Sequence, residues 1–268
     1  MNRKLGMNAD CLRGISTVDA LPLIKAAGFE TFFVGTFRDE QYEAIPAIKA
    51  EADRLGLTFE FIHGPFAGIN DMWLPGMDYL TIFEGLKRSI DVAAANGVPA
   101  VITHVSTKWN APMVNDLGLS RYDELVLYAR EKGVILAFEN LRMLGNLACL
   151  VDRYAKMDNV MFCFDCGHEH CFTKSVRWMD IFRFKTYCTH IHDNHGREWN
   201  DFDSPVDEHL LPFDGNYDYE QMMRKLDEYG YAGSLMLEIS HKKEAYAHLT
   251  AEEFLATAYE RIKKISQM

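Results

Sequence analysis

The sequence has no apolar run approaching the ~18 residues that a membrane span requires. Its first residues, Met1 to Asn8, also lack the long apolar segment of a secretory signal. From these two absences we expect a cytoplasmic protein with no membrane association.

Cysteine is too scarce to build a disulfide framework, with six residues in a chain of 268. Cys163 and Cys166 have the C-x-x-C spacing of half a zinc site, but the sequence contains no second such pair. We therefore expect reduced thiols that pack in the core.

Basic residues are outnumbered, with 28 Lys and Arg against 39 Asp and Glu and a net charge of -11. Such a net charge repels polyanions in general and indicates no basic surface for binding nucleic acid, although a local basic patch could still override it. The composition favours a small-molecule partner over nucleic acid, and it is compatible with a homo-oligomer.

What the sequence does contain is a regular alternation of short apolar runs and longer amphipathic stretches. Glycine follows several of the expected helices, as at Gly28 and Gly133, and Ser120 is the expected N-cap of one of them. The expected strands are 5–9, 29–34, 57–63, 101–104, 134–139, 160–165, 187–191 and 234–239. Helices are expected over 17–27, 39–55, 78–96, 120–132 and 250–265.

Eight such units in a chain of this length, close to the ~250 residues typical of the fold, predict an α/β protein that forms one (β/α)8 barrel. We expect a single domain over residues 1–268.

The most informative run is 134–138, which is wholly apolar and ends at Glu139 and Asn140. A strand covered on both faces has this composition, and its carboxyl end is where such sheets keep their ligands. Glu139 taken alone could equally cap a loop or pair with an arginine, because buried charges must be paired.

The same pattern at other strands favours a ligand role for Glu139 over a capping or pairing role, because six consecutive expected strands end in a residue type that binds metals. These residues are His63, His104, Glu139, Asp165, His190 and Glu238. So many ionisable groups at one end of a sheet would repel or desolvate one another unless a cation held them. Imidazoles with carboxylates suit Zn, Mn, Fe or Co rather than Ca.

Three further candidate residues lie in expected loops. His168 follows Asp165 in a D-x-x-H motif, and Asp207 and His209 form a D-x-H motif in a long connection over 193–216. His192 shares the strand face of His190, so we expect it to support the ligands from behind. Loop aromatics could stack on a sugar ring or a base, or simply pack their loops. They are Phe66, Trp73, Trp109 and Trp199.

In this order, the motifs resemble those of the xylose isomerase-like barrels over essentially the whole chain. That superfamily includes sugar and sugar-phosphate isomerases and epimerases, and also the AP endonuclease family 2. The motifs are Ile62-His63-Gly64-Pro65, Thr103-His104, Phe138-Glu139-Asn140, Asp165-Cys166-Gly167-His168, His190-Ile191-His192-Asp193, Asp207-Glu208-His209 and Leu237-Glu238.

Resemblance to the epimerase branch implies one divalent ion, Zn, Mn or Co, and a carbohydrate substrate. The implied ligands are Glu139, Asp165, His190 and Glu238. Glu139 and Glu238 would move a proton beside a carbonyl. Substrate contacts are expected from His168, His63, His104, Trp109 and Arg197.

Resemblance to the endonuclease branch implies three zinc ions around the same four residues, with Glu139 bridging two of them. The additional ligands would be His63, His104, His168, Asp207 and His209. A phosphodiesterase acting on DNA also needs positive charge near its site, and only Lys108, Arg142 and Arg197 could be placed on the ligand-bearing loops.

The end of the long connection favours the epimerase branch. Residues 209–218 resemble the H-L-x-P-G-x-G-x-x-D stretch of proteins described as sugar phosphate isomerases and epimerases, except that Phe213 replaces the first glycine. We expect a metal-dependent isomerase or epimerase, with an AP endonuclease as the alternative. A barrel that binds a ligand without catalysis is a third possibility.

Overall fold

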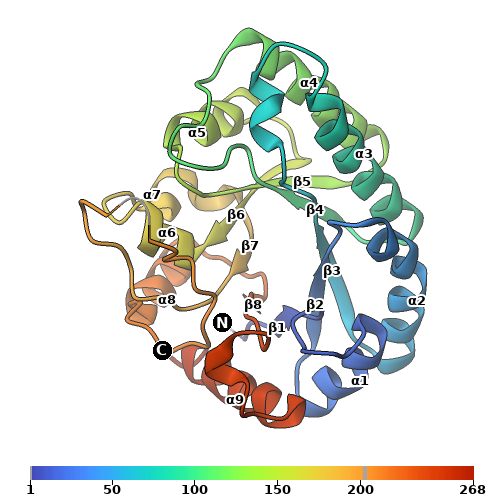
Figure 1. The fold of residues 1–268 in the computed structure, drawn as a ribbon, viewed down its shortest axis with the longest axis vertical. Coiled ribbons are helices and arrows are strands. Elements are labelled where there is room, and N and C mark those ends of the chain that lie inside the picture. The colour runs from blue at the N-terminus through green and yellow to red at the C-terminus, as the bar shows by residue number, and fades with distance from the viewer. Residues whose placement is uncertain (1, 202–203) are drawn as a thin grey trace. The chain divides into compact units, whose positions relative to one another are not determined.

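The computed structural model describes residues 2–201 and 204–268, in which strands and helices alternate along the chain (Figure 1). The strands are β1 (Leu5–Asn8), β2 (Thr31–Gly35), β3 (Thr58–His63), β4 (Ala100–Thr103), β5 (Ile135–Glu139), β6 (Val160–Asp165), β7 (Thr186–His190) and β8 (Leu235–Leu237). Nearly all their residues are buried, as expected for parallel strands covered on both faces.

The α-helices are α1 (Thr17–Ala27), α2 (Asp39–Leu55), α3 (Tyr79–Ala95), α4 (Asp116–Glu131), α5 (Leu144–Arg153), α6 (Cys166–Phe172), α7 (Trp178–Phe182), α8 (Tyr219–Glu228) and α9 (Ala251–Ile265). Short 3-10 helices are η1 (Ile69–Trp73), η2 (Arg183–Lys185) and η3 (Glu244–Tyr246). None of the helices in the described ranges is long and apolar enough to cross a membrane.

The strands form one sheet in the order β7-β6-β5-β4-β3-β2-β1-β8. The first strand pairs in parallel with both the second and the last, with Met7 opposite Phe32 and Leu237. Ile191, directly after β7, forms a parallel bridge with Leu237 of β8. This connectivity confirms the predicted (β/α)8 barrel.

The chain packs into two compact units, each assembled from separate stretches. Unit 1 comprises Met1–Val34, Pro46–Phe59 and Phe164–Met268. Unit 2 comprises Gly35–Ile45 and Glu60–Cys163. The boundary between the units passes through strands, and a single domain over residues 1–268 stays a prediction.

In unit 1, Met7 of β1 is fully buried in the core. Helices α1 and α9 pack against each other. Gly28 ends α1 as expected, with a left-handed φ of 111° and its N–H bonded to the carbonyls of Ile24 and Lys25. Near the C-terminus of the chain, Thr250 and Glu253 form a capping box that begins α9.

Unit 2 contains the parallel pairs β3–β4, β4–β5 and β5–β6, with Ile102 opposite Ala137. Asn115, and not Ser120, is the N-cap of α4, because its side chain accepts a hydrogen bond from the Gly118 N–H. The Ser120 hydroxyl instead donates to the Leu117 carbonyl inside the helix. The predicted N-cap was therefore wrong by more than a turn.

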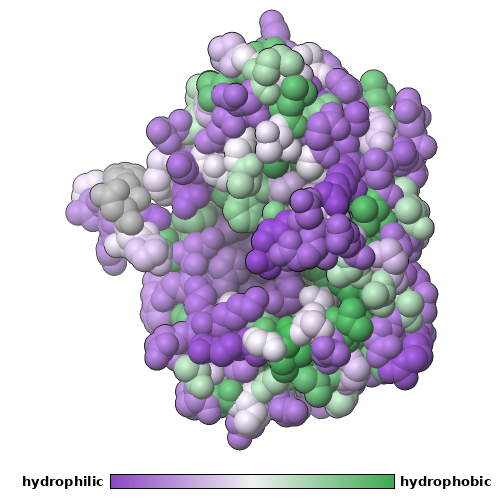
Figure 2. Space-filling view, turned by 45° about the vertical axis from the view of Figure 1, so that its right-hand side comes forward, coloured by the Kyte–Doolittle hydropathy of each residue, from purple (hydrophilic) through white to green (hydrophobic). Residues whose placement is uncertain are grey.

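All six cysteines are free thiols, and all but Cys149 are buried. On the face shown in Figure 2, hydrophilic residues predominate and hydrophobic residues occur in smaller, separate groups.

Candidate metal and substrate site

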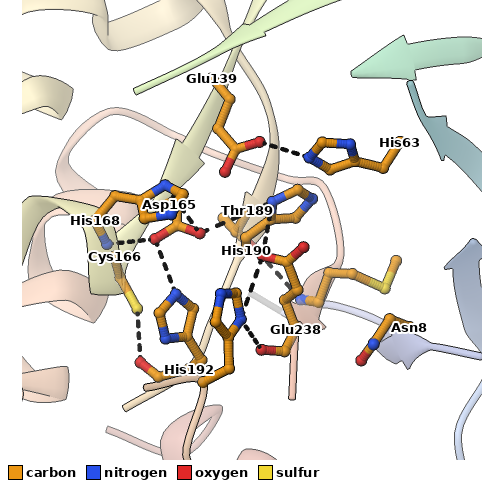
Figure 3. Close-up of polar contacts among 12 residues, drawn as sticks. Asn8, His63, Glu139, Asp165, Cys166, His168, Thr189, His190, His192 and Glu238 are labelled. Carbon is orange, nitrogen blue, oxygen red and sulfur yellow. Dashed lines mark hydrogen bonds and ion pairs between the residues drawn. The ribbon is translucent and has the colours of Figure 1, made fainter. Parts of the chain in front are cut away.

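Three of the predicted ligands lie together in unit 1. Asp165 ends β6, His190 ends β7, and Glu238 follows β8 directly. The Nδ1 atom of His190 lies 3.4 Å from Oε2 of Glu238 and 3.9 Å from Oδ2 of Asp165 (Figure 3). Phe33 of β2 stacks flat on the His190 ring at 4.9 Å, which holds the imidazole in this orientation. The ends of three strands thus bring two carboxylates and one imidazole to one place.

The chemistry of this set fits a divalent cation. Asp165 and His190 are fully buried, and Glu238 is mostly buried. Burying carboxylates is costly without compensating positive charge, and one imidazole can supply at most a single charge for two of them. Mixed nitrogen and oxygen donors are the ligands that Zn, Mn and Co accept.

A second group of donors lies in the same unit. It consists of His168, His192, Asp207 and His209, whose candidate ligand atoms all lie within 4.8 Å of one another. Oδ2 of Asp207 is 3.2 Å from Nε2 of His168, and Oδ1 is 3.3 Å from Nε2 of His209. The rings of His192 and His209 stack at 4.0 Å. Imidazole and carboxylate are both ligand types that zinc binds in proteins.

The electrostatics of this second group couple its members tightly. Burial raises the pKa of Asp207, but His209 and His168 outweigh it and hold that pKa well below the ordinary value. For His209, burial lowers the pKa, while Asp207 and Glu238 outweigh it and raise the pKa to about 9. A cation entering this group would therefore have to displace a proton from His209.

The D-C-G-H segment builds part of both groups at once. Asp165 is the N-cap of α6, since its Oδ1 accepts the His168 N–H at 2.6 Å. A Cβ atom on Gly167 would lie only 2.0 Å from Cε1 of His192, so glycine is required there for the His192 ring to fit. His192 in turn places Nε2 3.3 Å from Oδ1 of Asp165.

The long connection is organised by one buried carboxylate, Asp193. Its oxygens accept the N–H groups of Asn194, Phe213 and Tyr217 at 2.8 to 3.1 Å. Its backbone also pairs in both directions with that of Leu210. These bonds fix the segment that carries Asp207 and His209.

Phe213 adopts a left-handed backbone with a φ of 74°, a region that favours glycine. This explains why the resembling pattern has glycine at that position. Here the hydrogen bond to Asp193 and the contact of the Phe213 ring with Tyr219 at 5.2 Å hold the turn. The substitution noted in the sequence therefore leaves the turn in place.

Unit 2 holds a third group, composed of strand-end residues. His63 ends β3, His104 follows β4 and Glu139 ends β5. Nε2 of His63 lies 3.1 Å from Oε2 of Glu139 (Figure 3). Nε2 of His104 lies 3.3 Å from the same oxygen. Nδ1 of His63 is 2.8 Å from the Gly64 carbonyl, which can only accept, so Nδ1 carries a proton. This bond orients the ring toward Glu139.

A family model described as "Xylose isomerase-like TIM barrel" matches residues 21–264. The chain belongs to this family. An uncharacterized protein of Sinorhizobium fredii is 30% identical over 203 residues, which cover 66% of this chain and 62% of that protein. The chain thus matches less than two thirds of that relative's length.

Solved structures share the fold over nearly the whole of this xylose isomerase-like chain. A putative xylose isomerase from Rhodospirillum rubrum has a TM-score of 0.77 at 21% identity, covering 99% of each chain. A 3-keto-D-glucoside 4-epimerase from E. coli has a TM-score of 0.73 at 16% identity, covering 100% of each chain. Others with this fold are named as sugar 3-epimerases.

Trp109 and Arg197 were expected to contact substrate, and this stays a prediction; the structure shows their surroundings. Trp109 is partly exposed, with the guanidinium of Arg142 over its ring at 5.5 Å. Arg197 donates to the carbonyls of Cys171 at 3.0 Å, Ser204 at 3.4 Å and Asp201. These three bonds give Arg197 a role in ordering the long connection.

The other loop aromatics differ in their exposure to solvent. Trp73 is buried, and its Nε1 donates to the Val105 carbonyl at 2.7 Å, so it packs its loop. Trp199 is almost fully exposed, while Phe66 is partly exposed beside His104.

His192 was expected to support the ligands from behind, and this stays a prediction. In the structure it lies among the candidate donors of the second group, and its i, i+2 spacing from His190 was the available signal. Phe37, whose ring lies 5.7 Å from that of His63, carried no signal in the sequence.

Proposed function

We propose that the protein is a divalent-metal-dependent isomerase or epimerase of sugars or sugar phosphates. The observation that carries this proposal is the convergence of Asp165, His190 and Glu238 in unit 1. Membership of the xylose isomerase-like family and the sugar epimerases that share its fold support it.

We infer that Glu139 completes the ligand set of Asp165, His190 and Glu238. Glu139 ends β5, and the carboxyl ends of the strands of a (β/α)8 barrel carry its active site. When bound, the ion, Zn, Mn or Co, would polarise the substrate carbonyl and make the neighbouring C–H more acidic.

The chain's own residues would then move the proton. Glu139 takes it from the carbon beside the carbonyl, with His63 and His104 holding the carboxylate through Oε2. Glu238, entering the step protonated, gives its proton to the substrate, and proton exchange with water then returns both carboxyl groups to their starting states. His168 donates a hydrogen bond to a substrate hydroxyl.

A screen of ketoses, ketose phosphates and cyclic ketones with added Mn, Co or Zn tests the function. Conversion of at least one of them to an isomer or epimer is expected with the wild type. Glu139→Gln and Glu238→Gln should each lower kcat by about 100-fold or more, as expected for loss of a proton-transfer group. Equal turnover by all three proteins would contradict the proposal.

The second candidate is a trinuclear-zinc AP endonuclease, which the second group of donors in unit 1 favours. His168, Asp207 and His209 already lie within reach of one cation there, with His192 beside them. The test is cleavage of a DNA duplex that carries one abasic site. Cleavage by the zinc-loaded wild type that is lost in Glu139→Gln, without conversion of any carbohydrate, would establish this alternative.

A further inference from the structure

Two aromatic rings of unit 2 lie against each other at the surface. Phe37 follows β2 and is 45% exposed, and Phe66 follows β3 and is 40% exposed. Their ring centroids are 5.3 Å apart, at an interplanar angle of 68°. Single exposed apolar residues are common, but a pair in mutual contact on loops after neighbouring strands forms a continuous apolar surface.

This surface is joined to the candidate catalytic residues. The Phe66 ring stacks on His104 at 4.9 Å, and the Phe37 ring lies edge-on to His63 at 5.7 Å. The same two imidazoles contact Oε2 of Glu139 and are almost completely buried. The aromatic surface therefore begins at the histidines that hold Glu139 and continues outward to solvent.

The position of Phe37 depends on Gly35. A Cβ atom at residue 35 would lie 2.3 Å from Cε2 of Phe37, so only glycine leaves room for the ring to lie as it does. The Phe37 N–H also donates to Oε1 of Gln41 at 2.8 Å, which fixes the backbone of the loop. The ring is thus held in place while much of its surface faces water.

We propose that Phe37 and Phe66 form a subsite for a second ring, and that the substrate is a keto-glycoside rather than a free ketose. This inference rests on the proposed function. The reacting sugar would lie at Glu139, and the ring attached to it would lie on Phe37 and Phe66. A sugar ring suits this surface because its C–H face packs on aromatic rings while its hydroxyls stay in water. A free ketose has no second ring to cover it.

The test compares two keto-glycosides that share the reacting sugar, one with a glucosyl group and one with a methyl group as the aglycone. The ratio of their kcat/KM values is measured for the metal-loaded wild type, Phe37→Leu and Phe66→Leu. We expect the wild type to prefer the glucosyl compound about tenfold, since the second ring would cover both aromatic side chains. Each substitution should reduce the preference about threefold, mainly through KM.

Gly35→Ala should reduce the preference as Phe37→Leu does, because the added Cβ displaces the Phe37 ring. Phe184→Leu is the matched control. Phe184 is an exposed phenylalanine in η2, which lies before the first residue of β7, whereas the candidate ligand His190 lies at the last residue of that strand. Phe184→Leu should keep the wild-type ratio. Calorimetry with a non-reacting two-ring glycoside and its methyl counterpart gives the same comparison without turnover.

The outcomes separate the two proposals. Equal kcat/KM values for the two glycosides, unchanged in Phe37→Leu and Phe66→Leu, would overturn the subsite while leaving the isomerase intact. Failure to convert any carbohydrate would overturn both.

Discussion

The candidate ligands of unit 2 come from strand ends, whereas those of unit 1 come both from strand ends, as Asp165 and His190 do, and from a loop. In unit 2, His63, His104 and Glu139 all come from strand ends, so the pairing of β3, β4 and β5 fixes their spacing. In unit 1, Asp207 and His209 come from the long connection, whose shape depends on hydrogen bonds to Asp193. Sheet-borne donors are held by the backbone of the fold, whereas loop-borne donors are held by a few side-chain contacts.

This difference has a chemical consequence. Loop-borne donors can change without disturbing the sheet, so we infer that they adapt the site to a reaction. Strand-end donors retain their positions as long as the sheet forms. Substitutions of strand-end donors and substitutions in the long connection should therefore have different effects, the first on metal binding and the second on how the site is adapted to its reaction.

The largest effect is expected from Asp165→Asn. An asparagine side chain can still cap α6, so the protein should fold, but the substitution removes a negative charge beside His190 and Glu238. We expect nearly complete loss of the bound divalent ion, measured by elemental analysis on protein purified without chelator. Asp218→Asn, which replaces another N-cap, should keep the wild-type metal content. Normal metal content in Asp165→Asn would show that the site is wrong.

The next effect concerns the histidines of unit 2. In a one-metal isomerase His63 and His104 orient Glu139 without binding the ion, so His63→Ala and His104→Ala should lower kcat about 10- to 100-fold and retain the metal. Glu139→Gln should be more damaging than either. Loss of metal from either alanine variant would instead favour the multi-metal alternative.

A smaller effect, on stability, is expected from Asp193→Ala in unit 1. This variant leaves the N–H groups of Asn194, Phe213 and Tyr217 without their acceptor, which should lower the free energy of unfolding by about 3 kcal/mol. Urea denaturation in the presence of a chelator measures it. Asp193→Asn, which retains an acceptor, should lose less, and equal losses in the two variants would argue against this role of the carboxylate.

The smallest effect is a pH dependence in α6. Burial raises the pKa of Glu169 to about 7, although the Trp178 N–H and Arg177 favour its ionised form. The folded state therefore resists ionisation, and Glu169 makes stability fall as the pH rises from 4.5 to about 7. Relative to the wild type, Glu169→Gln should gain stability across this range. A difference that does not vary with pH would contradict the raised pKa.

The fold and the strand-end residues could be predicted from the sequence because several buried strands are apolar runs that end at, or directly before, a metal-binding residue type. Glu139 and Asp165 are identified in this way. The start of α4 was misplaced because Gly118 in its first turn looks like part of a loop, whereas Asn115 caps it. Asn and Ser are both common N-cap residues, and the folded geometry decides between Asn115 and Ser120.

The second group in unit 1 was predicted only in part. The D-x-x-H and D-x-H motifs indicated His168, Asp207 and His209. The inclusion of His192 depends on Gly167, which leaves room for its ring although it is distant along the chain. The position of Phe37 depends on Gly35 in the same way. Contacts of this kind depend on the folded backbone, so the sequence pattern does not reveal them.

Solvent exchange tests the central claim most directly, because an isomerase or epimerase of this kind must break a C–H bond beside a carbonyl. The wild type, loaded with Mn, Co or Zn, is incubated with the carbohydrate panel in heavy water, and deuterium is located by NMR. We predict deuterium at the carbon beside the carbonyl of at least one substrate, and none in Glu139→Gln. Conversion without deuterium incorporation, or incorporation that persists in Glu139→Gln, would contradict the account.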